Sequence, residues 1–195
     1  MAKTMSGQKI VTPSAESLAA SARTAQGKGL PPVHLWNPPF CGDLDMRIAR
    51  DGTWFYLGTP IGRKELVKLF STILRKDGED YFLVTPVEKV GIKVDDAPFV
   101  AVDFNPKGDA LVFVTNVGDE VVASSENPIR VVRDGETGEP SPYILVRSNL
   151  EALIDRKSFY RLVDIGEVRT FESTNWFGVV SSGTFFPIIP ASELE

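Results

Sequence analysis

The chain has 195 residues, of which 43% are hydrophobic and 24% charged, which is ordinary for a globular protein of one large or two small domains. Its net charge of -5 argues against broad, sequence-independent nucleic-acid binding, because such binding needs a basic face. One cysteine excludes an internal disulfide, and no stretch approaches the roughly 20 apolar residues of a membrane span, so we expect a cytoplasmic bacterial-type protein.

Residues 1–29 are expected to form a disordered leader followed by one helix. Thr12-Pro13 is typical of a helix start, with the threonine as N-cap and the proline in the first turn. Residues 15–26 are rich in alanine. Because Leu18 is the only large apolar residue in this stretch, the sequence predicts a helix that packs loosely or on a partner.

A first α+β half is expected over residues 30–85. Four prolines keep residues 30–39 out of a helix or a central strand. An Asp-Gly turn between residues 46–49 and 53–56 predicts a hairpin. The clearest helix is predicted over residues 63–75, where apolar side chains recur with a helical period, namely Leu66, Leu69, Phe70, Ile73 and Leu74.

A second, β-rich half is expected over residues 86–195. Short apolar runs separated by turn residues predict strands at 87–94, 99–104, 110–115, 143–147, 150–154, 176–181 and 184–188, with 81–85 before them. Residues 134–142 are rich in Gly, Glu and Pro and predict an exposed loop. A helix is predicted over residues 156–164.

Two segments of the chain can be aligned as an internal repeat. Residues 50–56 align with 147–153, and residues 63–70 align with 156–163. Each unit reads as strand, turn, strand and then a helix that opens with Arg-Lys. The shared helical period is generic, so duplication and coincidence both stay open.

The sequence resembles the bacterial family known as domain of unknown function 1285, over nearly the whole chain after Gly29. The matching positions are Trp36, Pro38, 41–43, 45–48, 51–54, 60–61, 83–90, 97–99, 115–116, Asp119, Tyr143, 146–147 and 159–160. The resemblance implies an α+β fold with two duplicated halves, the second loosely like a pleckstrin-homology barrel. It also implies a site between the halves for a nucleotide-like ligand and a role in signal transduction, without any catalytic activity.

Ten side chains form the predicted ligand site: Asp43, Asp45, Arg47, Arg63, Glu88, Lys89, Thr115, Asn116, Asp119 and Arg147. Guanidinium groups bind anions through two hydrogen bonds, and short hydroxyl and amide side chains orient a ligand. We expect three residues of the first hairpin to approach a second set at the junction of the halves. The first three are Asp43, Asp45 and Arg47, and the second set is Thr115, Asn116 and Asp119, or Arg147. The alternative is that these charges form surface ion pairs.

The sequence predicts no metal or cofactor site. Asp43 and Asp45 share one face of an extended segment, but hard cations need further oxygen ligands and no third partner is evident. His34 and Cys41 are the sole soft ligands, whereas structural zinc needs four. We expect Cys41 to be a small buried residue rather than a nucleophile. The chain lacks a glycine-rich phosphate loop and a credible Ser-His-Asp arrangement.

Three functional hypotheses follow. The leading one is a non-catalytic ligand-binding or regulatory module that senses a small anionic or nucleotide-like molecule between its two halves. The second is a protein-interaction module, in which the N-terminal helix or an exposed strand edge recruits a partner. The third is a hydrolase that uses the carboxylates near Asp43. The lack of a nucleophile–base pair favours the first two.

Overall fold

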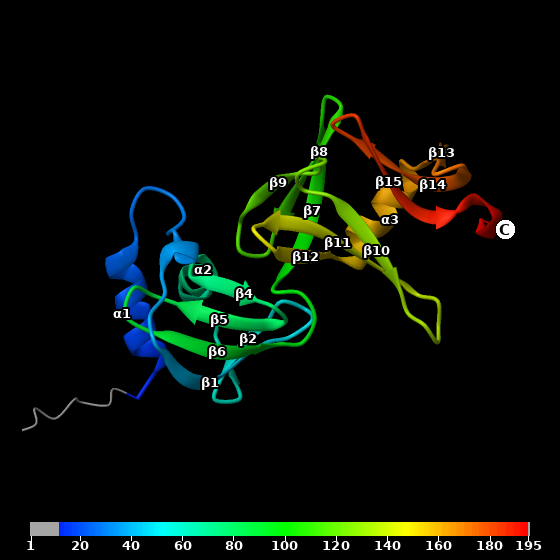
Figure 1. Cartoon of the computed structure of the whole chain (residues 1–195). Coiled ribbons are helices and arrows are strands. Elements are labelled where there is room, and N and C mark those ends of the chain that lie inside the picture. The colour runs from blue at the N-terminus through cyan, green and yellow to red at the C-terminus, as the bar shows by residue number, and fades with distance from the viewer. Residues whose placement is uncertain (1–11, 195) are drawn as a thin grey trace, which may run out of the picture.

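The computed structural model describes residues 12–194, so the predicted leader at residues 1–11 lies outside the described residues. The fold is α+β and is arranged as two halves that lie side by side (Figure 1). Over the described residues it contains three α-helices, two six-stranded sheets and one three-stranded sheet. Each six-stranded sheet is mixed, since one parallel pair interrupts its antiparallel ladder.

The first half holds the first sheet, in the order β3-β2-β1-β6-β5-β4, and the helices that cover it. Its elements are α1 (Ala15–Ala25), η1 (Val33–Leu35), β1 (Phe40–Ile48), β2 (Trp54–Tyr56), β3 (Thr59–Pro60), α2 (Lys64–Thr72), β4 (Leu74–Asp77), β5 (Asp80–Val84) and β6 (Lys89–Val94). The parallel pair is β1 with β6. The first sheet therefore continues past residue 85, where the sequence placed the boundary between the halves.

Helix α2 forms because one apolar stripe can be buried against the sheet. Leu69 and Phe70 are buried, and the Phe70 ring stacks on Trp54 at 6.2 Å between centroids. The predicted helix end at residue 75 is wrong, since Ile73 is the C-cap and Leu74 begins β4. Both residues stay buried, because the chain turns from the helix directly into a strand of the same core.

Helix α1 packs on α2 of its own chain. Leu18 is fully buried, together with three alanines of the same face. The N-cap is Ser14 rather than Thr12, because the Ser14 and Ser17 side chains each accept a hydrogen bond from the other's backbone N–H. Alanine allows a close approach of two helices, so a helix with one large apolar residue still finds a packed position.

The second half contains a sheet in the order β10-β11-β12-β7-β8-β9 and a small sheet in the order β13-β14-β15. Its elements are β7 (Phe99–Lys107), β8 (Ala110–Thr115), β9 (Glu120–Val122), β10 (Ile129–Arg133), β11 (Pro140–Arg147), β12 (Leu150–Ile154), α3 (Arg156–Asp164), β13 (Glu167–Phe171), β14 (Thr174–Ser181), β15 (Thr184–Pro190) and η2 (Ala191–Glu193). Helix α3 lies against β7 and β14. No helix between residues 12 and 194 has the length and apolar character needed to cross a membrane.

Candidate functional site

Four of the predicted site residues meet where the two halves touch. The Asn116 amide accepts from the Val100 N–H at 3.0 Å and donates to the Gly52 carbonyl oxygen of the first half at 3.4 Å. Arg147 donates to the Ser71 carbonyl oxygen at 2.8 Å and pairs with Asp119. The Thr115 hydroxyl accepts from the Asp119 N–H at 3.0 Å. Intramolecular contacts already engage these groups, and Asn116 and Arg147 join the two halves through their bonds to Gly52 and Ser71.

The predicted residues on β1 lie apart from that contact. Arg47 pairs with Asp95 at 2.5 Å, and its guanidinium lies 4.8 Å from the centroid of the Phe55 ring. Asp45 and Arg47 line a separate cavity of about 240 Å³. The Asp43 carboxylate lies over Gly91 of β6, in a space that a Cβ atom there would fill. Among residues 12–194, no hydrogen bond links these three side chains to Asn116, Asp119 or Arg147.

The remaining three predicted residues are also dispersed. Arg63 is the exposed N-cap of α2 and lines a hollow between α1 and α2. The Lys89 ammonium lies 2.8 Å from the Asp77 carboxylate and 3.9 Å from the Phe82 ring centroid. Glu88 is 9% exposed, and its burial raises the pKa of its carboxyl group.

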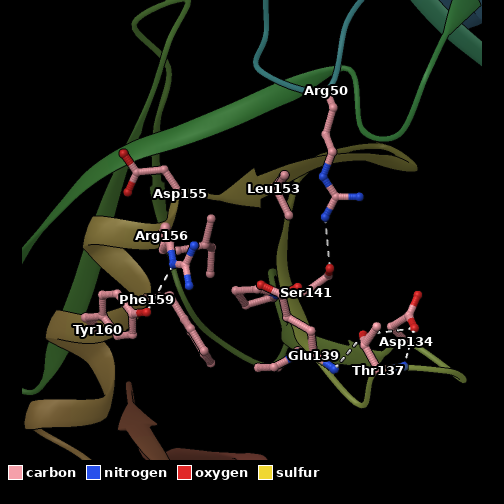
Figure 2. A pocket seen from close by; sticks show the side chains of 13 residues that line it. Arg50, Asp134, Thr137, Glu139, Ser141, Leu153, Asp155, Arg156, Phe159 and Tyr160 are labelled. Carbon is pink, nitrogen blue, oxygen red and sulfur yellow. Dashed lines mark hydrogen bonds between the residues drawn. The ribbon is translucent and has the colours of Figure 1, made fainter.

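A cavity of about 590 Å³ opens between the halves at a different place, which we call the junction cavity (Figure 2). Arg50, in the turn between β1 and β2, reaches it from the first half. The second half supplies Ser141 of β11, Leu153 of β12 and the first turns of α3, with Arg156 and Tyr160. The second half therefore forms most of the cavity, and the first half contributes the Arg50 side chain.

Arg50 connects this cavity to the segment that joins the halves. It donates through Nη2 to the Ser141 hydroxyl at 2.9 Å, and Nη1 lies 3.2 Å from the Asp96 carboxylate. Asp96 also accepts from the Tyr143 hydroxyl at 2.8 Å. Burial, and then this hydrogen bond, raise the pKa of Tyr143. The buried tyrosine is therefore a neutral donor to Asp96.

Arg156 and Tyr160 face the cavity together, because residues four apart lie on one side of a helix. The Arg156 Nε donates to the Tyr160 hydroxyl at 3.0 Å, and this contact raises the pKa of Arg156. Within residues 12–194, its two terminal nitrogens have no hydrogen-bond or ion-pair partner. These nitrogens are donors available to an anion.

The opposite wall is the loop between β10 and β11. The Asp134 carboxylate accepts from the Thr137 N–H at 2.8 Å and from its hydroxyl at 3.0 Å. These bonds, with the N–H of Glu136, lower the pKa of Asp134. Residues 134–139 form an exposed loop, as the sequence predicts, but residues 140–142 already belong to β11 and Pro142 is buried.

A second cavity of about 610 Å³ lies between the proline-rich segment and the turn after β11. Its arginines are already engaged. Arg75 makes two bonds of 2.9 Å with Asp77 and donates to the Trp36 carbonyl oxygen at 2.7 Å, and Arg147 holds the contact described above. This cavity offers a ligand fewer free donors than the junction cavity does.

The ten predicted site residues do not include Arg50, Ser141, Arg156 or Tyr160, which line the junction cavity. The spacing of Arg156 and Tyr160 on one helix face was the available signal. The expectation that Cys41 is buried is wrong, because it lies at the exposed start of β1. Among residues 12–194, no three or more His, Cys, Asp or Glu side chains lie close enough together to hold a metal ion.

Comparison with known proteins gives two family matches and two solved structures. The DUF1285 N-terminal domain matches residues 31–97, and the DUF1285 C-terminal domain matches residues 98–188. A crystal structure of a DUF1285 family protein from Silicibacter pomeroyi DSS-3 is 61% identical, with a TM-score of 0.81, over 91% of this chain and 97% of that one. One from Shewanella baltica OS155 is 29% identical, with a TM-score of 0.50, over 62% and 91%. Among curated proteins there is no match.

Proposed function

This chain belongs to the DUF1285 family, and from its geometry we propose that it is a non-catalytic ligand-binding module with a regulatory role in signal transduction. The ligand is a small anionic or nucleotide-like molecule bound between the two halves. The observation that carries this proposal is the junction cavity, to which Arg50 of one half and Arg156 of the other both contribute. Its volume of about 590 Å³ falls in the usual range for small-molecule sites, roughly 300–1,000 Å³.

The chemistry of the walls favours an anion with a flat or hydroxylated part. Arg156 has a planar pair of free donors suited to phosphate or carboxylate. Phe159 and Tyr160 add aromatic surface beside it, and Thr137 and Ser141 add hydroxyl groups. A neutral apolar ligand would leave the free donors of Arg156 without a partner, whereas an anion would bind them.

A ligand that binds Arg50 would compete with its present partners. One of these is Asp96, which belongs to the short segment between β6 and β7. The other is Ser141 of the second half, so ligand binding would alter a contact that joins the halves. Binding of a ligand at Arg50 would thereby change how the two halves are held relative to each other, as a sensing role requires.

A catalytic role has less support. The junction cavity is lined by neither a histidine nor a cysteine, Asp134 is engaged by Thr137, and the Ser141 hydroxyl accepts from Arg50. The Thr137 hydroxyl does donate to the Asp134 carboxylate at 3.0 Å, but this bond and two backbone N–H groups lower the pKa of Asp134, which makes it a poor general base. The hydrolase hypothesis near Asp43 gains nothing from that residue's position over Gly91.

Thermal unfolding with a panel of nucleotides, phosphate and pyrophosphate tests the proposal. A ligand that binds only the native state at about 100 times its Kd stabilises the protein by about 2.7 kcal/mol. We expect Arg156→Ala and Arg50→Ala to abolish this shift. Arg63→Ala is the matched control, since Arg63 also opens a helix but lies outside the cavity. If Arg47→Ala or Asp45→Asn removes the shift instead, the site is the cavity beside β1.

We also propose that the halves are related by duplication, the second being loosely like a pleckstrin-homology barrel. In support, each half contains a hairpin, then a helix, then three strands. In the first half these are β1–β2, α2 and β4–β6, and in the second they are β11–β12, α3 and β13–β15. The units differ in that β6 joins the sheet of β1, whereas β13–β15 form a sheet of their own. Superposition of α2 and α3 with their hairpins tests this; unrelated hairpin positions would reject it.

A further inference from the structure

The small sheet at the C-terminal end has one free edge, strand β13. It pairs on one side with β14 only, and residues 167–170 are exposed. The other sheet edges of the described chain are short or covered. Strand β3 has two residues and ends in proline, and β9 has three. Strand β4 lies beside η1, and β10 lies beside β15.

The hairpin between β13 and β14 determines which backbone groups of β13 point outward. Its loop has two residues, Glu172 and Ser173, both with positive φ, as in a type I′ turn. In such a hairpin the flanking residues exchange hydrogen bonds, and bonded pairs then alternate along the strand. Glu167, Arg169 and Phe171 therefore bond to β14. Val168 and Thr170 direct their N–H and C=O groups to the open edge.

The sequence of this edge is complementary to itself. If an antiparallel copy is centred on Val168, the two Val168 residues exchange backbone hydrogen bonds. Glu167 then lies opposite Arg169 of the second copy, and Arg169 lies opposite Glu167. These are non-hydrogen-bonded positions, where facing Cα atoms are only about 4.5 Å apart and side chains interact most closely.

We propose that β13 is a homodimerisation edge, at which two copies of this chain join their three-stranded sheets into one six-stranded sheet across a two-fold axis. Glu167 and Arg169 already form an ion pair within the strand, and both side chains are half exposed. In the dimer each carboxylate lies between two guanidinium groups. Like charges on a strand edge repel a second copy, whereas this alternating pair attracts one.

The dimer is weak, because a five-residue edge is much smaller than a standard interface of about 1,200–2,000 Å². The exposed Val168, and Ile165 just before the strand, add apolar surface at the contact. We therefore expect reversible association that rises with protein concentration. This inference is independent of the junction cavity and of any ligand.

Sedimentation velocity of the full chain over about a hundredfold concentration range tests the proposal. We expect the average mass of the wild type to rise from 21.4 kDa toward twice that value. Glu167→Arg places like positive charges opposite one another, and Arg169→Glu places like negative charges there, so each variant alone should stay monomeric. An equal mixture of the two variants restores opposite charges at every position and should associate again.

Glu126→Arg, at an exposed loop elsewhere in the second half, is the control for a change of net charge and should dimerise as the wild type does. Circular dichroism checks that each variant is folded. A wild type that stays monomeric throughout would overturn the proposal. So would single variants that associate as strongly as the wild type, or a mixture that remains monomeric.

Discussion

Glu88 lies in the turn between β5 and β6, where a carboxyl group is buried without an ion pair among residues 12–194. Burial disfavours the charged form and raises the carboxyl pKa above its ordinary value of 4.5. A raised native pKa gives stability that is fully present below the unfolded value and is lost as pH rises through the native value. At neutral pH the ionised group therefore opposes folding.

Glu88→Gln should for this reason raise the melting temperature at pH 7 and leave it nearly unchanged at pH 4, where the native carboxyl is already protonated. Thermal unfolding at the two pH values measures the difference. Glu120→Gln, on the exposed side of β9, is the matched control and should have little effect at either pH. An equal gain at both pH values would point to a cause other than charge.

Gly52 lies in close contact with the second half. It is buried with φ of +86°, and a Cβ atom there would lie 2.6 Å from the Asn116 Nδ2 and 3.1 Å from Val100. Asn116 has little freedom to move, since it accepts from the Val100 N–H. The tight turn of the first hairpin therefore needs glycine for its backbone conformation and for contact with the second half.

Gly52→Ala should cost about 1–2 kcal/mol for the left-handed backbone and more for the displaced Asn116. Gly58→Ala isolates the first term, because Gly58 has φ of +76° and nothing within 4 Å of the added atom. Urea unfolding of both variants measures the difference. Equal losses would mean that the two halves adjust to the added methyl group without cost.

At the scale of elements, local sequence patterns predicted the main helices and hairpins. They did not predict which strands distant in sequence pair with each other. The α2 stripe, the Asp-Gly hairpin and α3 follow from spacing and turn chemistry within a few residues. Strand β13 was not predicted, because its Glu, Arg and Thr have no apolar period and it is stabilised by pairing with β14. The parallel pairs depend on residues far apart in sequence, which no local signal specifies.

Leu18 tests how much one buried side chain of helix α1 contributes to the stability of the protein. Leu18 is fully buried against α2, so Leu18→Ala should cost about 2–5 kcal/mol through lost contacts and the cavity left behind. Ala20→Ser, on the exposed face of the same helix, should change stability by less than about 0.5 kcal/mol. Urea unfolding measures both. A small loss for Leu18→Ala would mean that α1 contributes little to the core.

At the scale of the molecule, the structure separates the two groups of residues that the sequence placed together at the junction between the halves. Thr115, Asn116, Asp119 and Arg147 were expected to lie near a second group of residues and do lie where the halves meet. Their expected neighbours Asp43, Asp45 and Arg47 on β1 lie elsewhere. The pairing of β1 with β2 and β6 determines where these side chains are placed. Arg47 is directed to Asp95 at the end of β6 rather than toward the second half.

Arg147 is the side chain whose removal should most affect how the halves hold together. It donates to the Ser71 carbonyl oxygen of the first half, pairs with Asp119 of the second, and lies 4.8 Å from the Phe99 ring centroid. Hydrogen bonds to charged groups contribute about 1.5–3 kcal/mol, so Arg147→Ala should destabilise the protein by at least this amount. Arg147→Lys should recover only part of the loss, because an ammonium group cannot reach both oxygens in the geometry of a guanidinium.

A double-mutant cycle with Asp119→Asn separates the ion pair from the bond to Ser71. The two changes share one contact, so their effects on the free energy of unfolding should add to more than the loss in the double variant. Asn149→Ala removes a different hydrogen bond between the halves, from its amide to the Lys76 carbonyl oxygen at 3.1 Å. Its effect should add to that of Asp119→Asn. Strict additivity of Arg147→Ala and Asp119→Asn would mean that the two side chains act independently, and Arg147 would then join the halves through its bond to Ser71 without help from Asp119.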